Sequence, residues 1–134
     1  LLDLFDATGE TRWANAAQNL ADTLLAKFWD AEDAGFFFSG QDHEELIARS
    51  KDLFDGALPS ANGVATRVLT RLAKLPGGER YGEAAHTLLV AYRGVLRRAP
   101  NGTHTLILAA LDAFEDAPQT KPFAPVVLYT PPPV

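Results

Sequence analysis

An internal repeat constrains the fold of this chain more than any other feature of its sequence. The segment LFDATGETRWANAAQNL, residues 4–20, aligns with LAKLPGGERYGEAAHTL, residues 72–88, at an offset of 68 residues (72 − 4). Each copy reads as a helix, a glycine turn and a second helix that opens with an arginine and an aromatic residue. A helical hairpin of this kind buries one face on its neighbour, so the repeat predicts a solenoid or a closed toroid.

The residues that match between the two copies have a packing reason. Trp13 matches Tyr81, and an aromatic side chain at this position can fill the gap beside the glycine turn. The pair Ala16–Ala17 matches Ala84–Ala85, one turn further on, where small side chains let two helices approach closely. Leu20 then matches Leu88, which continues the apolar stripe of the second helix.

Apolar spacing predicts five helices. The first ends near Thr8–Gly9, the second begins near Glu10 and ends at WDAEDAG, and the third follows Ser60 and is broken by PGG at residues 76–78. The fourth carries Tyr81 to Leu96 and ends near residues 97–98, and the fifth carries Leu106 to Phe114. The residues that we expect to be mostly buried are Trp13, Leu20, Leu24, Val68, Leu72, Leu88, Tyr92 and Leu111.

Two further segments have a different character. GFFFSG at residues 35–40 and ELIARS at residues 45–50 are short and β-compatible, so they predict a small hairpin or two extended segments. Alternation would put Phe36 and Phe38 on one face and Phe37 on the other. Residues 117–134 form a proline-rich tail behind a helical domain of residues 1–116. The predicted fold is therefore all-α, built from antiparallel helical hairpins with a short β-hairpin insertion.

Composition excludes several classes of function. The net charge of −5 argues against nucleic acid as a partner, and no apolar run approaches the roughly 20 residues of a membrane span. The chain contains no cysteine, which fits a cytoplasmic, reducing compartment and leaves no thiolate nucleophile. His43, His86 and His104 lack the close spacing of a zinc site, so we expect no metal and no cofactor.

The stretch KDLFDGALPSANGVA, residues 51–65, carries the candidate site. Asp52 and Asp55 are three residues apart, and paired carboxylates can serve as general acid and base on a sugar. Lys51 and Asn62 are candidate ligand contacts, and His43 lies close enough in sequence to join them. A ligand in a helical toroid would meet these residues where the loops line its central cavity.

The same stretch has a structural interpretation. Asp55–Gly56 is a turn signal, and Pro59 and Ser60 are good residues for a helix start, with Ser60 as the N-cap. Asp55 could instead accept hydrogen bonds from loop amides. Turn chemistry explains these residues without a ligand, but it leaves Lys51 and Asn62 unexplained. Both interpretations stay open at the level of sequence.

Residues 30–75 resemble the helical domain of the spermatogenesis-associated, thioredoxin-fold-containing proteins. The matching residues are Gly35–Phe36–Phe37–Phe38, Leu46–Ile47, Arg49, Lys51–Asp52, Asp55–Gly56–Ala57, Pro59–Ser60, Asn62 and Val64–Ala65. The resemblance implies part of an (α/α)6 toroid, similar to six-hairpin glycosidases and N-acylglucosamine 2-epimerases. It also implies a thioredoxin-like domain that precedes this segment. The resemblance carries no settled activity, and our leading hypothesis is a parent protein that binds or acts on carbohydrate.

Three consequences remain expectations. We expect a sugar-like small molecule as ligand, and we expect the segment to associate with itself, because part of a toroid leaves apolar helix faces uncovered. Whether the parent is an enzyme stays open. The alternative is a tetratricopeptide-like scaffold without catalysis, suggested by RYGEAAHTLLVAY at residues 80–92. The offset of 68 favours the toroid over such repeats, whose period is about 34 residues.

Overall fold

The computed structural model describes residues 1–40 and 49–115, and within these ranges the chain is all-α. The predicted tail and most of ELIARS lie outside the described residues. None of the helices in the described part is long and apolar enough to cross a membrane. The helices are α1 (Leu2–Thr8), α2 (Thr11–Phe28), α3 (Ala61–Ala73), α4 (Glu79–Arg98), the short 3-10 helix η1 (Pro100–Gly102) and α5 (His104–Glu115).

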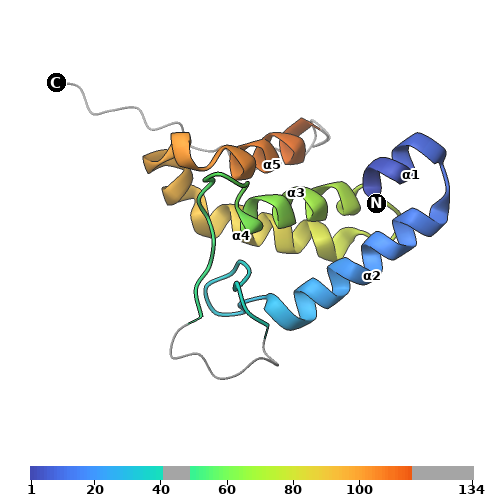
Figure 1. Ribbon diagram of the computed structural model, residues 1–134, viewed down its shortest axis with the longest axis horizontal. Helices are drawn as coiled ribbons and strands as arrows, with labels where there is room; N and C mark the ends of the chain where they lie inside the picture. The colour runs from blue at the N-terminus through green and yellow to red at the C-terminus, as the bar shows by residue number, and fades with distance from the viewer. Residues whose placement is uncertain (41–48, 116–134) are drawn as a thin grey trace.

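The helices form hairpins with two different ends. In Figure 1, α3 lies between α4 and α5, and the α1–α2 hairpin lies beside them. The connections from α1 to α2 and from α3 to α4 are tight turns at one end of the array. The described residues 29–40 and 49–60 and η1 lie at the opposite end, where α3 and α5 begin. The chain therefore places its longest connection, η1 and two helix N-termini together.

The predicted repeat is present in the structure. The second helix of each copy begins at an equivalent residue, Thr11 in α2 and Glu79 in α4, because 79 − 11 is again 68. The turn glycines match as well, since Gly9 has φ +69° and Gly77 has φ +74°. Both glycines lie in the left-handed region that a side chain disfavours. The turn glycine and the start of the second helix thus keep their positions in both copies, whereas α3 ends at Ala73, three residues earlier relative to the turn than α1 does at Thr8.

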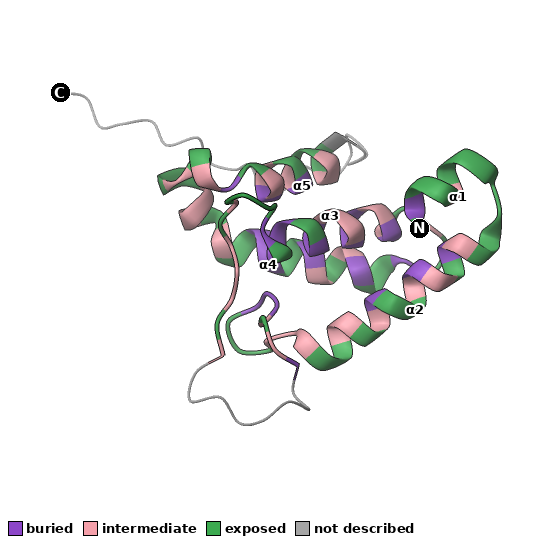
Figure 2. Cartoon of the chain, viewed as in Figure 1, coloured by how far each residue is buried: buried purple, intermediate pink, exposed green. Residues whose placement is uncertain are grey.

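The core lies between α3, α4 and α5 and extends towards α2 (Figure 2). Of the residues predicted as core, Leu72 and Leu88 are fully buried, while Leu24, Val68 and Tyr92 pack against the core and Trp13 is half-buried. Two predictions are wrong, because Leu20 is 63% exposed and Leu111 is 53% exposed. Helical spacing identifies the apolar face of a helix, but it does not show whether a neighbour covers the full length of that face.

The predicted β-hairpin is not seen as strands in the described residues, where Trp29 and Phe36 form an isolated antiparallel bridge. The Phe38 N–H donates to the Ser50 carbonyl at 2.8 Å, so these two ends do lie side by side. The expected alternation is wrong, since Phe36 is 3% exposed and Phe38 is 74% exposed. Phe36 instead packs edge-on against Trp29, with 5.1 Å between the ring centroids.

Candidate functional site at the loop end

A tight turn begins the long connection between α2 and α3. The Oδ1 atom of Asp30 accepts hydrogen bonds from the backbone N–H groups of Glu32 (2.9 Å) and Asp33 (3.3 Å). The chain then passes through two residues with positive φ, Ala34 at 60° and Gly35 at 83°. A Cβ atom on Gly35 would lie 3.0 Å from the Tyr92 ring, so the turn also needs a glycine for close packing. This turn presents the Ala34 carbonyl towards α4.

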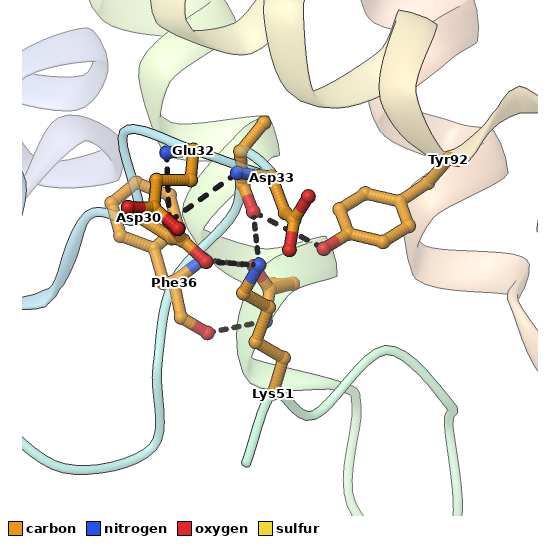
Figure 3. Close-up of polar contacts among 8 residues, drawn as sticks. Asp30, Glu32, Asp33, Phe36, Lys51 and Tyr92 are labelled. Carbon is orange, nitrogen blue, oxygen red and sulfur yellow. Dashed lines mark hydrogen bonds and ion pairs between the residues drawn. The ribbon is translucent and has the colours of Figure 1, made fainter. Parts of the chain in front are cut away.

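Lys51 fastens this turn to the rest of the protein (Figure 3). Its Nζ atom lies 2.7 Å from Asp30 Oδ2 and donates to the Ala34 carbonyl at 2.7 Å. The Tyr92 hydroxyl donates to the same carbonyl at 3.1 Å. Burial by itself lowers the pKa of Lys51, but its hydrogen bonds with Asp30 and Tyr92 outweigh burial and raise that pKa. Lys51 is therefore a charged group with its partners already in place.

Asn62 holds the next part of the loop from within α3. Its side chain is fully buried, its Oδ1 atom accepts the Phe36 N–H at 2.6 Å, and its Nδ2 atom donates to the Phe36 carbonyl at 2.9 Å. Nδ2 also donates to the Asp52 carbonyl at 2.8 Å. The amide therefore pairs with an extended backbone as a neighbouring strand would. Its hydrogen-bonding groups are satisfied inside the protein.

The two candidate carboxylates stand in different environments. Asp55 Oδ1 accepts the Ser60 N–H and Asp55 Oδ2 accepts the Thr105 N–H, both at 2.8 Å, so one carboxylate joins the starts of α3 and α5. Burial raises the pKa of Asp55, but these backbone hydrogen bonds outweigh burial and bring the pKa down to about 2. Asp52 Oδ2 accepts the Ala61 N–H at 3.1 Å. Among the described residues, nothing donates a hydrogen bond to Asp52 Oδ1.

The predicted site residues therefore gather at one end of the array, although most of them already bind protein atoms. His43 lies outside the described residues. Sequence reasoning missed Asp30 and Tyr92, because one stands in an acidic run typical of a solvated turn and the other in an apolar helical stripe. No grouping of three metal-ligating side chains occurs in the described ranges. The predicted N-cap is confirmed, because Ser60 Oγ accepts the Gly63 N–H at 3.2 Å.

The chain is similar in sequence to curated proteins from animals. It is 39% identical to "Spermatogenesis-associated protein 20" of mouse and of human over 101 residues, which is 75% of this chain and 13% of each relative. It is 32% identical over 98 residues to "Uncharacterized protein B0495.5" of Caenorhabditis elegans, again 13% of that protein. The matches thus span a small part of these relatives. No family model and no solved structure matches the chain.

Proposed function

We propose, starting from the homology of this chain to a segment of spermatogenesis-associated protein 20, that it forms part of an (α/α)6 toroid whose loop end binds a sugar-like ligand. One observation carries the proposal. Residues 29–40 and 49–60, η1 and the starts of α3 and α5 lie at one end, and the tight glycine turns lie at the other. Binding residues concentrate on loops that a rigid scaffold holds in place. The class of ligand follows from the similarity to six-hairpin glycosidases that the family resemblance implies.

Asp52 is the side chain of this segment that best fits contact with a ligand. Its Oδ2 atom is anchored on the start of α3, which fixes the carboxylate in place, while Oδ1 accepts no hydrogen bond from the described residues and could accept one from a hydroxyl group. Asp55 fits a positioning role instead, because a carboxyl group with a pKa of about 2 is a poor proton donor or acceptor near neutral pH. We assign Lys51 and Asn62 to holding the loop, and His43 stays a proposed ligand contact.

The test is a thermal-shift screen of the intact protein against a library of sugars, with and without Asp52→Asn. Asparagine can still accept the Ala61 N–H through its own side-chain oxygen, so we expect the ligand-free Tm to stay nearly unchanged. We expect the sugar-induced rise in Tm to disappear. Asp112→Asn is the matched control, because Asp112 pairs with Arg67 at 2.9 Å and lies on α5. A library in which no sugar shifts the unchanged protein would contradict the proposal.

A scaffold without catalysis is the second candidate. Its support is that Lys51, Asp55 and Asn62 each bind protein groups that fix the helices and the loop, so architecture alone explains these three residues. Under this alternative, Asp52→Asn would leave every small-molecule response unchanged. The same screen therefore separates the two candidates.

A further inference from the structure

The chain contains two Asn–Gly pairs, Asn62–Gly63 and Asn101–Gly102. Asparagine deamidates most readily before glycine, because glycine has no Cβ to shield its backbone nitrogen from the asparagine side chain. Both pairs lie at the loop end of the array, since one stands in the first turn of α3 and the other in η1. The two pairs share a sequence but differ in their environment.

Asn62–Gly63 is protected on both sides of the reaction. The Asn62 side chain is fully buried, and its Oδ1 and Nδ2 atoms bind the Phe36 backbone at 2.6 and 2.9 Å. The Gly63 N–H donates to Ser60 Oγ at 3.2 Å in the first turn of α3. The Gly63 nitrogen can therefore reach the amide carbon of Asn62 only after α3 and the loop separate, which approaches global unfolding.

Asn101–Gly102 lies on the surface instead. Asn101 is exposed, and within residues 1–40 and 49–115 its side chain makes no hydrogen bond or ion pair. In η1 the Gly102 N–H donates to the Ala99 carbonyl at 3.1 Å, and opening this one hydrogen bond frees the nitrogen. Short 3-10 turns have poorer hydrogen-bond geometry than α-helices. Local opening of η1 therefore costs far less than global unfolding.

We propose that Asn101 is a site of spontaneous deamidation, and that the reaction alters the loop end of the array. The Gly102 nitrogen loses its proton to solvent base and bonds to the Cγ atom of Asn101, and the Cγ–Nδ2 bond breaks with release of ammonia. Water then opens the cyclic imide at either of its carbonyl carbons, which leaves aspartate or isoaspartate at position 101. This inference does not depend on the sugar ligand, so either proposal can fail alone.

Isoaspartate has a structural consequence at this position, because it adds one carbon to the backbone ahead of Gly102. The Gly102 carbonyl accepts the Asp55 N–H at 2.8 Å. The next residue, Thr103, is fully buried, and its Oγ1 atom donates to the Ala99 carbonyl at 3.0 Å. The longer backbone displaces at least one of these contacts. We therefore expect the isoaspartyl product to hold residues 49–60 less firmly and to have a lower Tm.

The test is peptide mapping by mass spectrometry of the intact protein after incubation at mildly alkaline pH, in buffer and in urea. In urea the two asparagines should react at similar rates, because both precede glycine. In buffer we expect Asn62 to react at least about a hundred-fold more slowly than Asn101, since only Asn62 waits for global opening. Equal rates of the two asparagines in buffer would overturn the proposal. So would a rate for Asn101 that falls as far between urea and buffer as the rate for Asn62.

Gly102→Ala is the matched variant. Alanine fits at this position, because the φ of Gly102 is not positive and an added Cβ would lie 3.4 Å from Phe54 Cδ1, an ordinary contact. The Cβ shields the backbone nitrogen, so we expect deamidation of Asn101 to slow about ten-fold or more while the initial Tm stays nearly unchanged. An unchanged rate would overturn the route through the Gly102 nitrogen.

Asn101→Asp separates the effect of the new charge from that of the longer backbone. This variant carries the carboxylate of the aspartyl product without the added backbone carbon. We expect it to melt at a higher temperature than the isoaspartyl form, which chromatography separates from the incubated protein. A Tm of Asn101→Asp as low as that of the isoaspartyl form would overturn the proposed effect of the longer backbone on the loop end.

Discussion

Asp55 is the residue on which the starts of two helices depend. Its carboxylate accepts one N–H at the start of α3 and one at the start of α5, and its own N–H donates to the Gly102 carbonyl at 2.8 Å. A negative charge at a helix N-terminus is favourable, and here one charge serves two helices. The loop end is therefore held in shape by a residue that sequence analysis left open between catalysis and architecture.

We expect Asp55→Asn to lower the free energy of unfolding by about 1–3 kcal/mol, because charged hydrogen bonds are replaced by weaker ones. The pKa of Asp55 is about 2 in the folded protein and about 3.9 in an unfolded chain. This contribution is therefore fully present above about pH 4 and is lost as the pH falls towards about 2. Thermal melts at neutral pH and near pH 3 measure both effects. Equal melts for Asp55→Asn and for the control Asp112→Asn would contradict this prediction.

Whether the role of a site residue could be predicted depends on how far along the sequence its hydrogen-bond partner lies. Ser60 caps the helix that it begins, so its role follows from local sequence. Asn62 and Lys51 bind partners far away in sequence, Phe36 and Asp30. No spacing rule connects such residues, so sequence analysis marked both as unexplained and then proposed a ligand. In the folded protein, the partners of Asn62 and Lys51 are other residues of the chain and not a ligand.

At the scale of the helices, glycine turns set the geometry of each hairpin. Sequence spacing predicted all five helices, because their apolar faces and stop signals are local features. It failed at Leu20 and Leu111, because cover by a neighbouring element is not a local feature. At these two leucines the apolar stripe of the helix extends past the part that neighbouring helices of the described chain cover.

Gly9→Ala and Gly77→Ala should each lower the free energy of unfolding by about 1–2 kcal/mol, the cost of a left-handed backbone with a side chain. An added Cβ meets no atom within 4 Å at either position, so the backbone alone causes the loss. Gly56→Ala is the matched control, since its Cβ is also unobstructed but its φ is not positive. Urea unfolding of the three variants checks this. A loss at Gly56 as large as at Gly9 would show that the turns do not hold the left-handed geometry.

Leu72→Ala should lower the free energy of unfolding by about 2–5 kcal/mol, because Leu72 is fully buried between the helices. Leu20→Ala deletes the same atoms at a site that is 63% exposed, and we expect a change within about 0.5 kcal/mol. Chemical unfolding of both variants makes this comparison. Similar values for the two leucines would remove Leu72 from the core.

At the scale of the whole molecule, apolar side chains remain on the outside of the helical array. Leu108 and Leu111 on α5 are 45% and 53% exposed, and they lie one helical turn apart. Adjacent exposed leucines of this kind favour association, because contact removes them from water. This side of α5 is thus the place in the described chain where contact with another molecule would remove the most apolar surface from water.

We expect the chain to associate with itself at high concentration through the apolar side of α5. Sedimentation velocity over a range of concentrations measures this. Leu111→Glu should shift the equilibrium towards monomer by introducing a charge into the contact, whereas Val90→Glu on α4 is a control at a comparably exposed apolar site. A chain that sediments as a monomer throughout the range would contradict the expectation.

The two unlike ends of the array also bear on how such a protein can evolve. The turn at Gly9 is too short to absorb an inserted residue. Because a helix turns by about 100° per residue, one insertion there would change which side chains of α2 face inward. Segment 29–60 is long, and its ends are fixed by Asn62, Lys51 and Asp55, so added residues between these anchors need not move a helix. We expect insertions and deletions among relatives to accumulate at this end. New specificities can then arise there while the glycine end keeps the fold unchanged.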